Sequence, residues 1–313
     1  MTRIVCLTTG GTIAALRDDA GALVTAQAGA AVAGHLHDVE VVEVARCSST
    51  VLGLAEVFGW ARDLAARLAA PDVGGAVVTV GTETLEEVAY LLDLAVRSEQ
   101  PVVVTGAMRP PDAPDADGAA NLADALAVAR APAARGACAL VVLDGAVHAA
   151  RDATKRHASA RDAFTSPGGP LGRVRGGELE LLRPPPPREH LAAARLEERV
   201  TLVRAALGAG GEAVDGAVAA GARGLVLETF PAGGVPPAMA AAVERALDAG
   251  VAVVAASRAA GGPVTDYAGV GEGRWLAERG VLLAPGLQPA KARIRLALAL
   301  GLDDPAALAR VFL

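Results

Sequence analysis

Several residue types are scarce in this 313-residue chain, and each scarcity excludes a class of structure or partner. Cysteine occurs three times, at Cys6, Cys47 and Cys138, each alone in an apolar stretch. This spacing excludes a disulfide framework and a cysteine metal site, and it predicts small buried side chains of the kind found in a cytoplasmic protein. Aromatic residues make up only 3 % of the chain and are scattered, so they do not form a platform for stacking bases.

Clusters of positive charge and long apolar runs are also missing. The formal net charge is -6 with a pI near 5.5, and there is no basic block, which excludes a nucleic-acid partner. No apolar stretch is long enough to span a membrane, and we expect no membrane partner. The amino terminus begins with a strand-like run and lacks the pattern of a secretory signal, so we expect a cytoplasmic location.

Lysine is the scarcest basic residue. Only Lys155 and Lys291 occur among 29 lysines and arginines. In a chain that prefers arginine so strongly, a lysine invites a specific explanation. One explanation is chemical, because an ammonium can lose its proton in a protein and a guanidinium does not.

The apolar residues, at 52 % of the chain, alternate between strand-like and helix-like segments. Such alternation predicts an α/β protein whose mainly parallel sheet is covered by helices on both faces, with ligands at the carboxyl ends of the strands. The segment 17–37 has no clear periodicity, and we expect a loop leading into a helix. The predicted strands of the first half are residues 3–9, 39–45, 76–80, 101–105 and 137–143, and the predicted helices cover residues 54–68, 84–96 and 121–129.

A run of four prolines at 184–187 marks the predicted division between two domains, because it can form neither a helix nor a central strand. We expect a large N-terminal catalytic α/β domain at 1–182, a proline-rich linker at 183–199 and a smaller C-terminal α/β domain at 200–313.

The first predicted strand ends in a glycine turn that carries a hydroxyl. The turn is Gly10-Gly11-Thr12-Ile13-Ala14. Glycines there allow positive φ and close approach of a ligand to backbone N–H groups. A hydroxyl beside such donors suits an acyl-transfer nucleophile, although a phosphate-binding or purely structural turn fits these residues equally.

A second glycine turn and Lys155 supply partners for Thr12. Thr82 and Glu83 follow the third predicted strand, and Lys155 follows the fifth, so all three can face the same crevice. A hydroxyl, a carboxylate and a lysine together can relay a proton. Each also has a structural interpretation: Thr82 as a helix N-cap, Glu83 as a first-turn carboxylate at the helix dipole, and Lys155 as a solvated surface charge.

The order of the motifs resembles the bacterial-type L-asparaginase family. Gly10-Gly11-Thr12 with its neighbours is similar to the first family signature, and the run from Gly81 to Glu87 is similar to the second. Five further segments resemble the family in the same order: Gly106-Ala107-Met108-Arg109-Pro110, Ala116-Asp117-Gly118 with Asn121-Leu122, Arg151-Asp152-Ala153-Thr154-Lys155, Phe164-Thr165-Ser166-Pro167 with Gly169-Pro170-Leu171-Gly172, and Pro289-Ala290-Lys291-Ala292-Arg293.

The resemblance implies an amidohydrolase that converts L-asparagine to L-aspartate and ammonia through an acyl-enzyme on Thr12. It implies that Thr82 and Lys155 support proton transfer or activate the water, and that Glu83 holds the α-ammonium of the substrate. Backbone donors near Gly11 and Gly81 would stabilise the oxyanion. It implies a homodimer or homotetramer. We expect no cofactor and no metal.

The resemblance also implies a set of substrate contacts. Ala107 would contact the substrate amide through its backbone, and Ser49 with Thr50 would lie near the α-carboxylate. Glu272 is the loose candidate for a glutamate reaching into a neighbouring subunit's site.

Two departures from the family pattern affect the expected site. The family has aspartate where this chain has Glu83, which is one methylene longer. The family also has a tyrosine on the loop after the nucleophile, whereas residues 12–36 contain no aromatic residue, and Leu23, Val24 or Thr25 lies near that place. The first departure leaves open a glutaminase-asparaginase or related amidase, and the second a non-catalytic amino-acid-binding homologue. A nucleotide-binding enzyme is a poorer alternative, since the glycine turn lacks the phosphate-loop spacing and lysine.

Overall fold

The computed structural model describes residues 2–33, 36–262, 267–304 and 306–312. The chain forms two compact units, Met1–His190 and Leu191–Leu313. The boundary falls inside segment 183–199. The proline run itself lies along the first unit, because Cys138 N–H donates to Pro186 O (3.1 Å) and Ala137 bridges Pro187.

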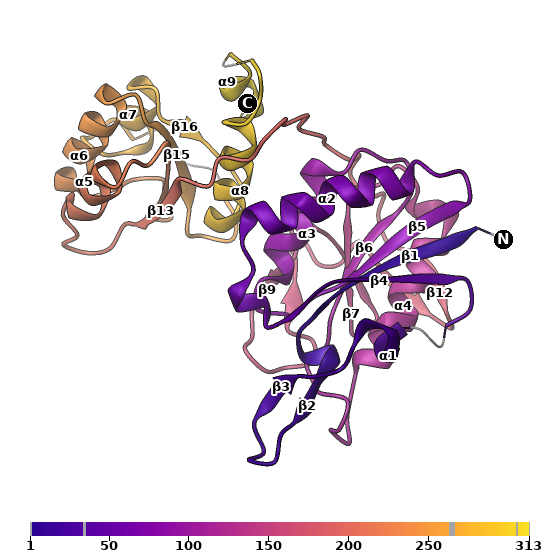
Figure 1. Ribbon diagram of the computed structural model, residues 1–313. Coiled ribbons are helices and arrows are strands. Elements are labelled where there is room, and N and C mark those ends of the chain that lie inside the picture. The colour runs from indigo at the N-terminus through magenta and orange to yellow at the C-terminus, as the bar shows by residue number, and fades with distance from the viewer. Residues whose placement is uncertain (1, 34–35, 263–266, 305, 313) are drawn as a thin grey trace. The chain divides into compact units, whose positions relative to one another are not determined.

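The first unit is built on one eight-stranded sheet in the order β12-β11-β8-β7-β6-β5-β1-β4 (Figure 1). Five strands are parallel, so their carboxyl ends share an edge. Seven of the eight residues of β1 are buried, as expected of an apolar strand between two neighbours. The parallel strands are β1 (Arg3–Gly10), β4 (Val39–Cys47), β5 (Val73–Thr79), β6 (Val102–Thr105) and β7 (Leu140–Leu143).

Helices cover both faces of this sheet. Helices α2 (Leu54–Leu68) and α3 (Leu85–Ala95) pack together on one face. Helices α1 (Gly29–Ala33) and α4 (Gly118–Arg130) share a core on the other face with alternate residues of β1, β5, β6 and β7. The crossovers through α3 and α4 advance in the same direction across the sheet but on opposite faces, so they have opposite hands, which is rare.

The sheet continues beyond β7 with antiparallel strands, which the sequence pattern did not predict. These are β8 (Ala146–Ala149), β11 (Gly172–Arg175) and β12 (Glu178–Leu181). A separate two-stranded sheet pairs β9 (Thr154–Lys155) with β10 (Phe164–Thr165). These strands have two to four residues, too few to give a period-two pattern.

The segment 17–37, expected as a loop leading into a helix, contains the helix and also two short strands that the sequence did not predict. Strands β2 (Ala15–Arg17) and β3 (Leu23–Thr25) form a hairpin, and α1 follows. The hairpin strands have three residues each and are mostly exposed, so they carry no apolar alternation. The hairpin begins directly after the turn η1 (Thr12–Ala14). Its residues therefore stand beside Thr12.

The second unit contains a four-stranded parallel sheet in the order β13-β14-β15-β16. Its strands are β13 (Val200–Arg204), β14 (Gly224–Thr229), β15 (Ala252–Ser257) and β16 (Leu282–Leu283), and its helices are α5 (Glu212–Ala219), α6 (Pro237–Asp248), α7 (Gly273–Glu278), α8 (Pro289–Ala299) and α9 (Ala307–Val311). The two units thus give the predicted fold class, a large α/β domain with a mainly parallel sheet and a smaller α/β domain. In the part of the chain described above, no helix has both the length and the apolar character needed to cross a membrane.

Candidate active site

The candidate site lies where the neighbouring strands β5, β1 and β4 end. Strand β1 ends at Gly10, and both Gly10 (φ 101°) and Gly11 (φ 77°) have a positive φ. That conformation strains residues with a Cβ, so glycine allows the chain to turn sharply at the strand end. Thr12 follows as the first residue of η1, half-buried at the sheet edge.

The two glycine turns touch each other at this edge. A Cβ added to Gly11 would lie 2.5 Å from the Cα of Gly81, and one added to Gly81 would lie 2.7 Å from Ser49 Oγ. Only glycine permits this approach. The pairing brings the segments after β1, β5 and β4 together, so residues 11, 81 and 49 meet although they are far apart in sequence.

A cleft of about 150 Å³ opens at this meeting point. Six of the residues expected in the site line it, together with four others. The expected six are Gly11, Thr12, Ser49, Gly81, Thr82 and Glu83, and the others are Ala15, Leu23, Thr25 and Ser48.

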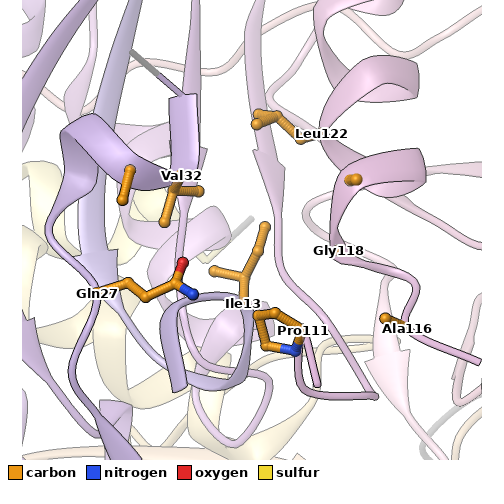
Figure 2. A pocket seen from close by; sticks show the side chains of 9 residues that line it. Ile13, Gln27, Val32, Pro111, Ala116, Gly118 and Leu122 are labelled. Carbon is orange, nitrogen blue, oxygen red and sulfur yellow. The ribbon is translucent and has the colours of Figure 1, made fainter. Parts of the chain in front are cut away.

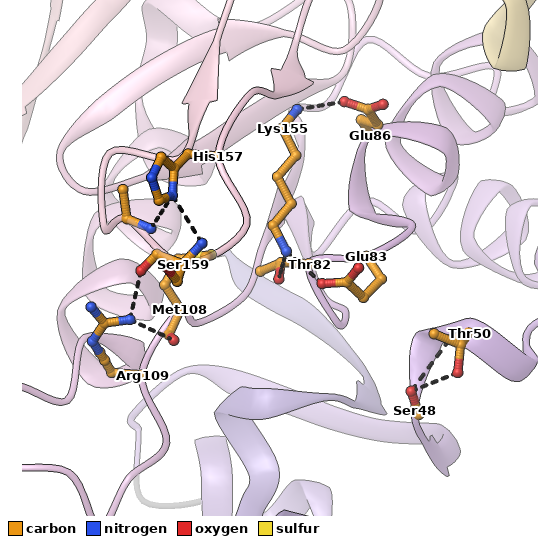
Figure 3. A network of polar contacts seen from close by, with 11 residues as sticks. Ser48, Thr50, Thr82, Glu83, Glu86, Met108, Arg109, Lys155, His157 and Ser159 are labelled. Carbon is orange, nitrogen blue, oxygen red and sulfur yellow. Dashed lines mark hydrogen bonds and ion pairs between the residues drawn. The ribbon is translucent and has the colours of Figure 1, made fainter.

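Lys155 reaches Thr82 and Glu83 from β9 (Figure 3). Its Nζ lies 3.0 Å from Thr82 Oγ1 and 2.5 Å from Glu83 Oε1. The lysine side chain is 12 % exposed and that of Glu83 is 63 % exposed, so the carboxylate stands at the mouth and the ammonium lies within. A hydroxyl, a lysine and a carboxylate are thus joined in one hydrogen-bonded chain.

The structural interpretations of these three residues do not hold. The N-cap of α3 is Thr84 rather than Thr82. The acids of the first turn are Glu86 and Glu87, so Glu83 lies before the helix. Lys155 is mostly buried and paired, which excludes a solvated surface charge.

Of the two residues of the turn after β4 that were expected near the substrate carboxylate, one lines the cleft and the other does not. Ser49 is 3 % exposed and lines the cleft, and its Oγ has no hydrogen-bond partner among the described residues. Thr50 is exposed and does not line the cleft, and its Oγ1 lies 2.9 Å from Ser48 Oγ (Figure 3). The adjacent hydroxyl of Ser48 is a cleft residue that sequence reasoning did not single out.

Ala107 lies beside the cleft without lining it. Its side chain is buried in the core shared with α4, while its loop passes Thr82: a Cβ at Gly106 would lie 3.4 Å from Thr82 Cγ2. The buried carboxylate of Asp117 holds this loop by accepting from Met108 N–H (3.0 Å) and Arg109 N–H (2.8 Å). These two hydrogen bonds hold the backbone next to Ala107 in place, although the alanine side chain has no functional group.

Two of the residues expected to contact the substrate have other contacts in the structure. The Gly11 N–H donates to Cys47 O (3.0 Å), so this N–H is already paired within the fold. Glu272 is the N-cap of α7, in the second unit, and is not among the residues lining the cleft of the first.

The hairpin supplies Leu23 and Thr25, two of the three residues expected near the position of the family's tyrosine, to the wall of the cleft. Leu23 is 47 % exposed and Val24 is 42 % exposed. Thr25 is the hydroxyl-bearing residue of this hairpin that reaches the cleft. The absence of aromatic residues from 12–36 could be seen in the sequence, but the identity of the replacement needed the hairpin register.

A second cavity of about 220 Å³ lies on the other side of η1 (Figure 2). Ile13 and Leu122 line it, and Gln27 supplies an amide. Among the described residues, its lining contains no acid, base or hydroxyl. The hydroxyls and the carboxylate that can take part in chemistry therefore lie in the first cleft.

Comparisons with known proteins match nearly the whole chain. Residues 3–187 match the family Asparaginase, N-terminal, and residues 199–312 match the Glutaminase/Asparaginase C-terminal domain. The probable L-asparaginase of Deinococcus radiodurans is 36 % identical over 96 % of this chain and 93 % of its own length.

Two further proteins are similar to this chain, one in sequence and one in structure. L-asparaginase 2 of Bacillus subtilis is 38 % identical over 74 % of this chain, and the match spans 62 % of the Bacillus protein. The crystal structure of a probable cytoplasmic L-asparaginase from Campylobacter jejuni superposes with a TM-score of 0.90 at 28 % identity, covering 100 % of this chain and 99 % of that one.

Proposed function

Because this chain belongs to the asparaginase family, we propose that it hydrolyses L-asparagine to L-aspartate and ammonia in the cleft at the carboxyl edge of β1 and β5. One observation carries the proposal beyond family membership. Thr12 shares a small cleft with Thr82 and Glu83, and both are hydrogen-bonded to the mostly buried Lys155.

Thr12 is the nucleophile in this proposal. Its Oγ attacks the side-chain amide carbon of asparagine, and the proton from Oγ passes to the departing nitrogen. The C–N bond breaks, ammonia departs, and the acyl group remains bound to Thr12 as an ester. In the second half, water adds to the ester carbon and its proton returns to Oγ as aspartate is released.

Thr82 and Lys155 are the proton-transfer groups. A lysine can act as a base only when it holds no proton, and an aliphatic ammonium can lose one in a protein whereas arginine does not. Lys155 lies 3.0 Å from Thr82 Oγ1, so one hydroxyl connects the amine to the cleft. The same pair can deprotonate the incoming water.

Glu83 and Ser49 are the proposed contacts for the charged end of the substrate. The Glu83 carboxylate, largely exposed at the mouth, offers a negative charge to the α-ammonium. The buried, unpartnered Ser49 Oγ offers a hydrogen bond to the α-carboxylate, beside the paired hydroxyls of Ser48 and Thr50. Backbone groups of Gly11, Gly81 and Ala107 complete the proposed contacts with the substrate.

A glutaminase-asparaginase is the second candidate. Glu83 favours it, because a side chain one methylene longer than aspartate places the carboxylate elsewhere and changes the length of substrate that fits. A non-catalytic amino-acid-binding protein is the third, because Leu23 and Thr25 replace the expected phenol.

We also propose a homodimer or homotetramer in the cytoplasm. The assembly rests on the family resemblance and on Glu272 as a residue offered to a neighbouring site. The location is supported by three cysteines that are all free thiols.

Ammonia release from L-asparagine, L-glutamine and D-asparagine tests the proposal. We expect L-asparagine to have the highest kcat/KM and Thr12→Val, which keeps the shape and loses the hydroxyl, to lower kcat by at least about 1000-fold. Calorimetric binding of aspartate to Thr12→Val is the control for an intact cleft. A preference for glutamine selects the second candidate, and aspartate binding without ammonia release by the wild type selects the third.

A further inference from the structure

We propose that Glu86 is a positioning residue for Lys155. This inference rests on the proposed function and adds a residue that does not line the cleft. The Oε2 of Glu86 accepts the backbone N–H of Lys155 at 2.7 Å, and Figure 3 shows this bond at the opposite end of the lysine from Thr82 and Glu83. Lys155 is therefore held at both its backbone and its Nζ.

Both attachments are made to one short stretch of chain. Thr82 and Glu83 bind Nζ just before α3, and Glu86 in the first turn of α3 binds the backbone. Residues 82 and 86 are held in fixed relation by the start of the helix. The same element thus fixes where the lysine begins and where its amine ends, which is the condition for a proton-transfer group to keep its alignment.

The strand that carries Lys155 needs such an attachment. β9 has two residues and, in the described part of the chain, forms its ladder with the two residues of β10. At the far end of this hairpin, Arg109 Nη1 donates to Ser159 O at 2.7 Å (Figure 3), but this contact is exposed to water. The bond from Glu86 is half-buried and is made by the backbone of Lys155 itself, so it ties the lysine backbone to the first turn of α3.

A simpler role for Glu86 makes a different prediction. An acid in the first turn of a helix is stabilised by the helix dipole, and that role depends on its negative charge. Positioning depends on an acceptor oxygen. Glu86→Gln loses the charge and keeps an acceptor, whereas Glu86→Ala loses both, so the two variants separate the roles.

The experiment compares kcat, KM and the pH profile of kcat for the wild type, Glu86→Gln and Glu86→Ala with L-asparagine. We expect Glu86→Ala to lower kcat about 10- to 100-fold with KM within about 2-fold, because the substrate contacts remain and the lysine shifts. The pH profile of kcat should also change, because the proton-transfer groups are no longer aligned. Glu86→Gln should stay within about 3-fold of the wild type. Glu56→Ala, an exposed acid in the first turn of α2, is the matched control and should leave kcat unchanged.

Hydrogen exchange of the peptide covering residues 150–158 gives a readout independent of turnover. We expect it to exchange about 10-fold faster in Glu86→Ala than in the wild type, and Glu86→Gln to protect it largely. Equal loss of kcat in both Glu86 variants, or an unchanged kcat and exchange rate in a folded Glu86→Ala, overturns the inference. An inactive wild type with accelerated exchange in Glu86→Ala would instead overturn the proposed function and leave the positioning contact in place.

Discussion

Glu83 has two partners to serve, the Lys155 amine and the proposed substrate ammonium. At 2.5 Å from Nζ it is bonded to the lysine in the free protein, yet its side chain is 63 % exposed and open to a ligand. A carboxylate forms an ion pair with the substrate ammonium, whereas glutamine at this place offers a hydrogen bond without the negative charge, which binds the ammonium less strongly.

Glu83→Gln should therefore weaken the binding of asparagine. We expect KM to rise about 10-fold or more, in line with about 1.5–3 kcal/mol for a hydrogen bond to a charged group. Succinamic acid, which lacks the α-ammonium, is the comparison substrate, and its KM should change little. If kcat falls equally for both substrates with KM unchanged, Glu83 acts through Lys155 and not on the ammonium.

His148 is a buried histidine next to the hairpin that carries Lys155. It lies on β8, is 3 % exposed, and its Nδ1 lies 2.9 Å from Ser166 Oγ, just after β10. Burial, together with the charge of Arg183, lowers the pKa of His148 to about 4 from an ordinary value of 6.5. The folded protein thus holds the neutral ring at a pH where the unfolded chain takes up a proton.

Stability should fall on acidification through this residue. The unfolded state binds more protons between pH 6.5 and about 4, so the free energy of unfolding decreases as the pH falls through that window. The full effect is at most about 3 kcal/mol, from about 1.36 kcal/mol per pKa unit. Urea midpoints measured from pH 7.5 to 4 should decline less for His148→Gln than for the wild type. Equal declines of the urea midpoint in the two proteins would show that the His148 ring does not contribute to the pH dependence of stability.

At the scale of the element, the turn after β1 and the β2–β3 hairpin each contain a glycine with a positive φ, and the surroundings of the two differ. Gly11 has φ 77° and ψ -170°, a conformation open essentially to glycine alone, and it abuts Gly81. Gly21 in the β2–β3 hairpin has φ 80° but nothing within 4 Å of an added Cβ. Substitutions at Gly11 and Gly21 therefore separate the effect of a strained φ from the effect of a close contact with another turn.

Gly11→Ala should lower kcat by more than about 100-fold, because the methyl group must push apart the turns that carry Thr12 and Thr82. Gly21→Ala is the control and should cost only about 1 kcal/mol of stability for the strained φ, with kcat nearly unchanged. Ammonia release and thermal denaturation of both variants measure the two effects. Equal activities would mean that the contact between the turns is not needed for catalysis.

At the scale of the whole molecule, the question is whether Glu272 completes another subunit's site. A mixture of subunits carrying Thr12→Ala and Glu272→Ala answers it after joint refolding. If Glu272 serves a neighbour, a mixed dimer contains one site with an intact Thr12 and an intact Glu272, and we expect activity well above that of either variant alone. Sedimentation velocity of the wild type should show a dimer or tetramer.

Thr12→Ala mixed with Lys155→Ala is the control for this experiment. Both residues lie in the first unit, and in the proposal each site takes them from one chain, so no mixed site is complete. Recovery in the control, or no recovery with Glu272→Ala, would contradict a shared site.

The local sequence determined the parts of this protein that depend on neighbouring residues. Apolar runs ending at glycine or at a polar turn indicated the parallel strands. Helical periodicity predicted residues 54–68 as a helix, with the bounds that α2 has, and the motif order indicated the family. The candidates Thr12, Thr82 and Lys155 also came from the sequence, because each stands beside a strand end in a recognisable pattern. These features are local, and a linear pattern can encode them.

The tertiary structure decided what depends on contacts across the chain. It showed that the amide of Gly11 binds Cys47 O and that Glu86 holds the backbone of Lys155. It also put Leu23 and Thr25 in the wall of the cleft, through a hairpin too short to leave a pattern. The opposite hand of the α4 crossover was likewise decided by packing. Hydrogen bonds between residues tens of positions apart have no periodic signature, so only the folded chain reveals them.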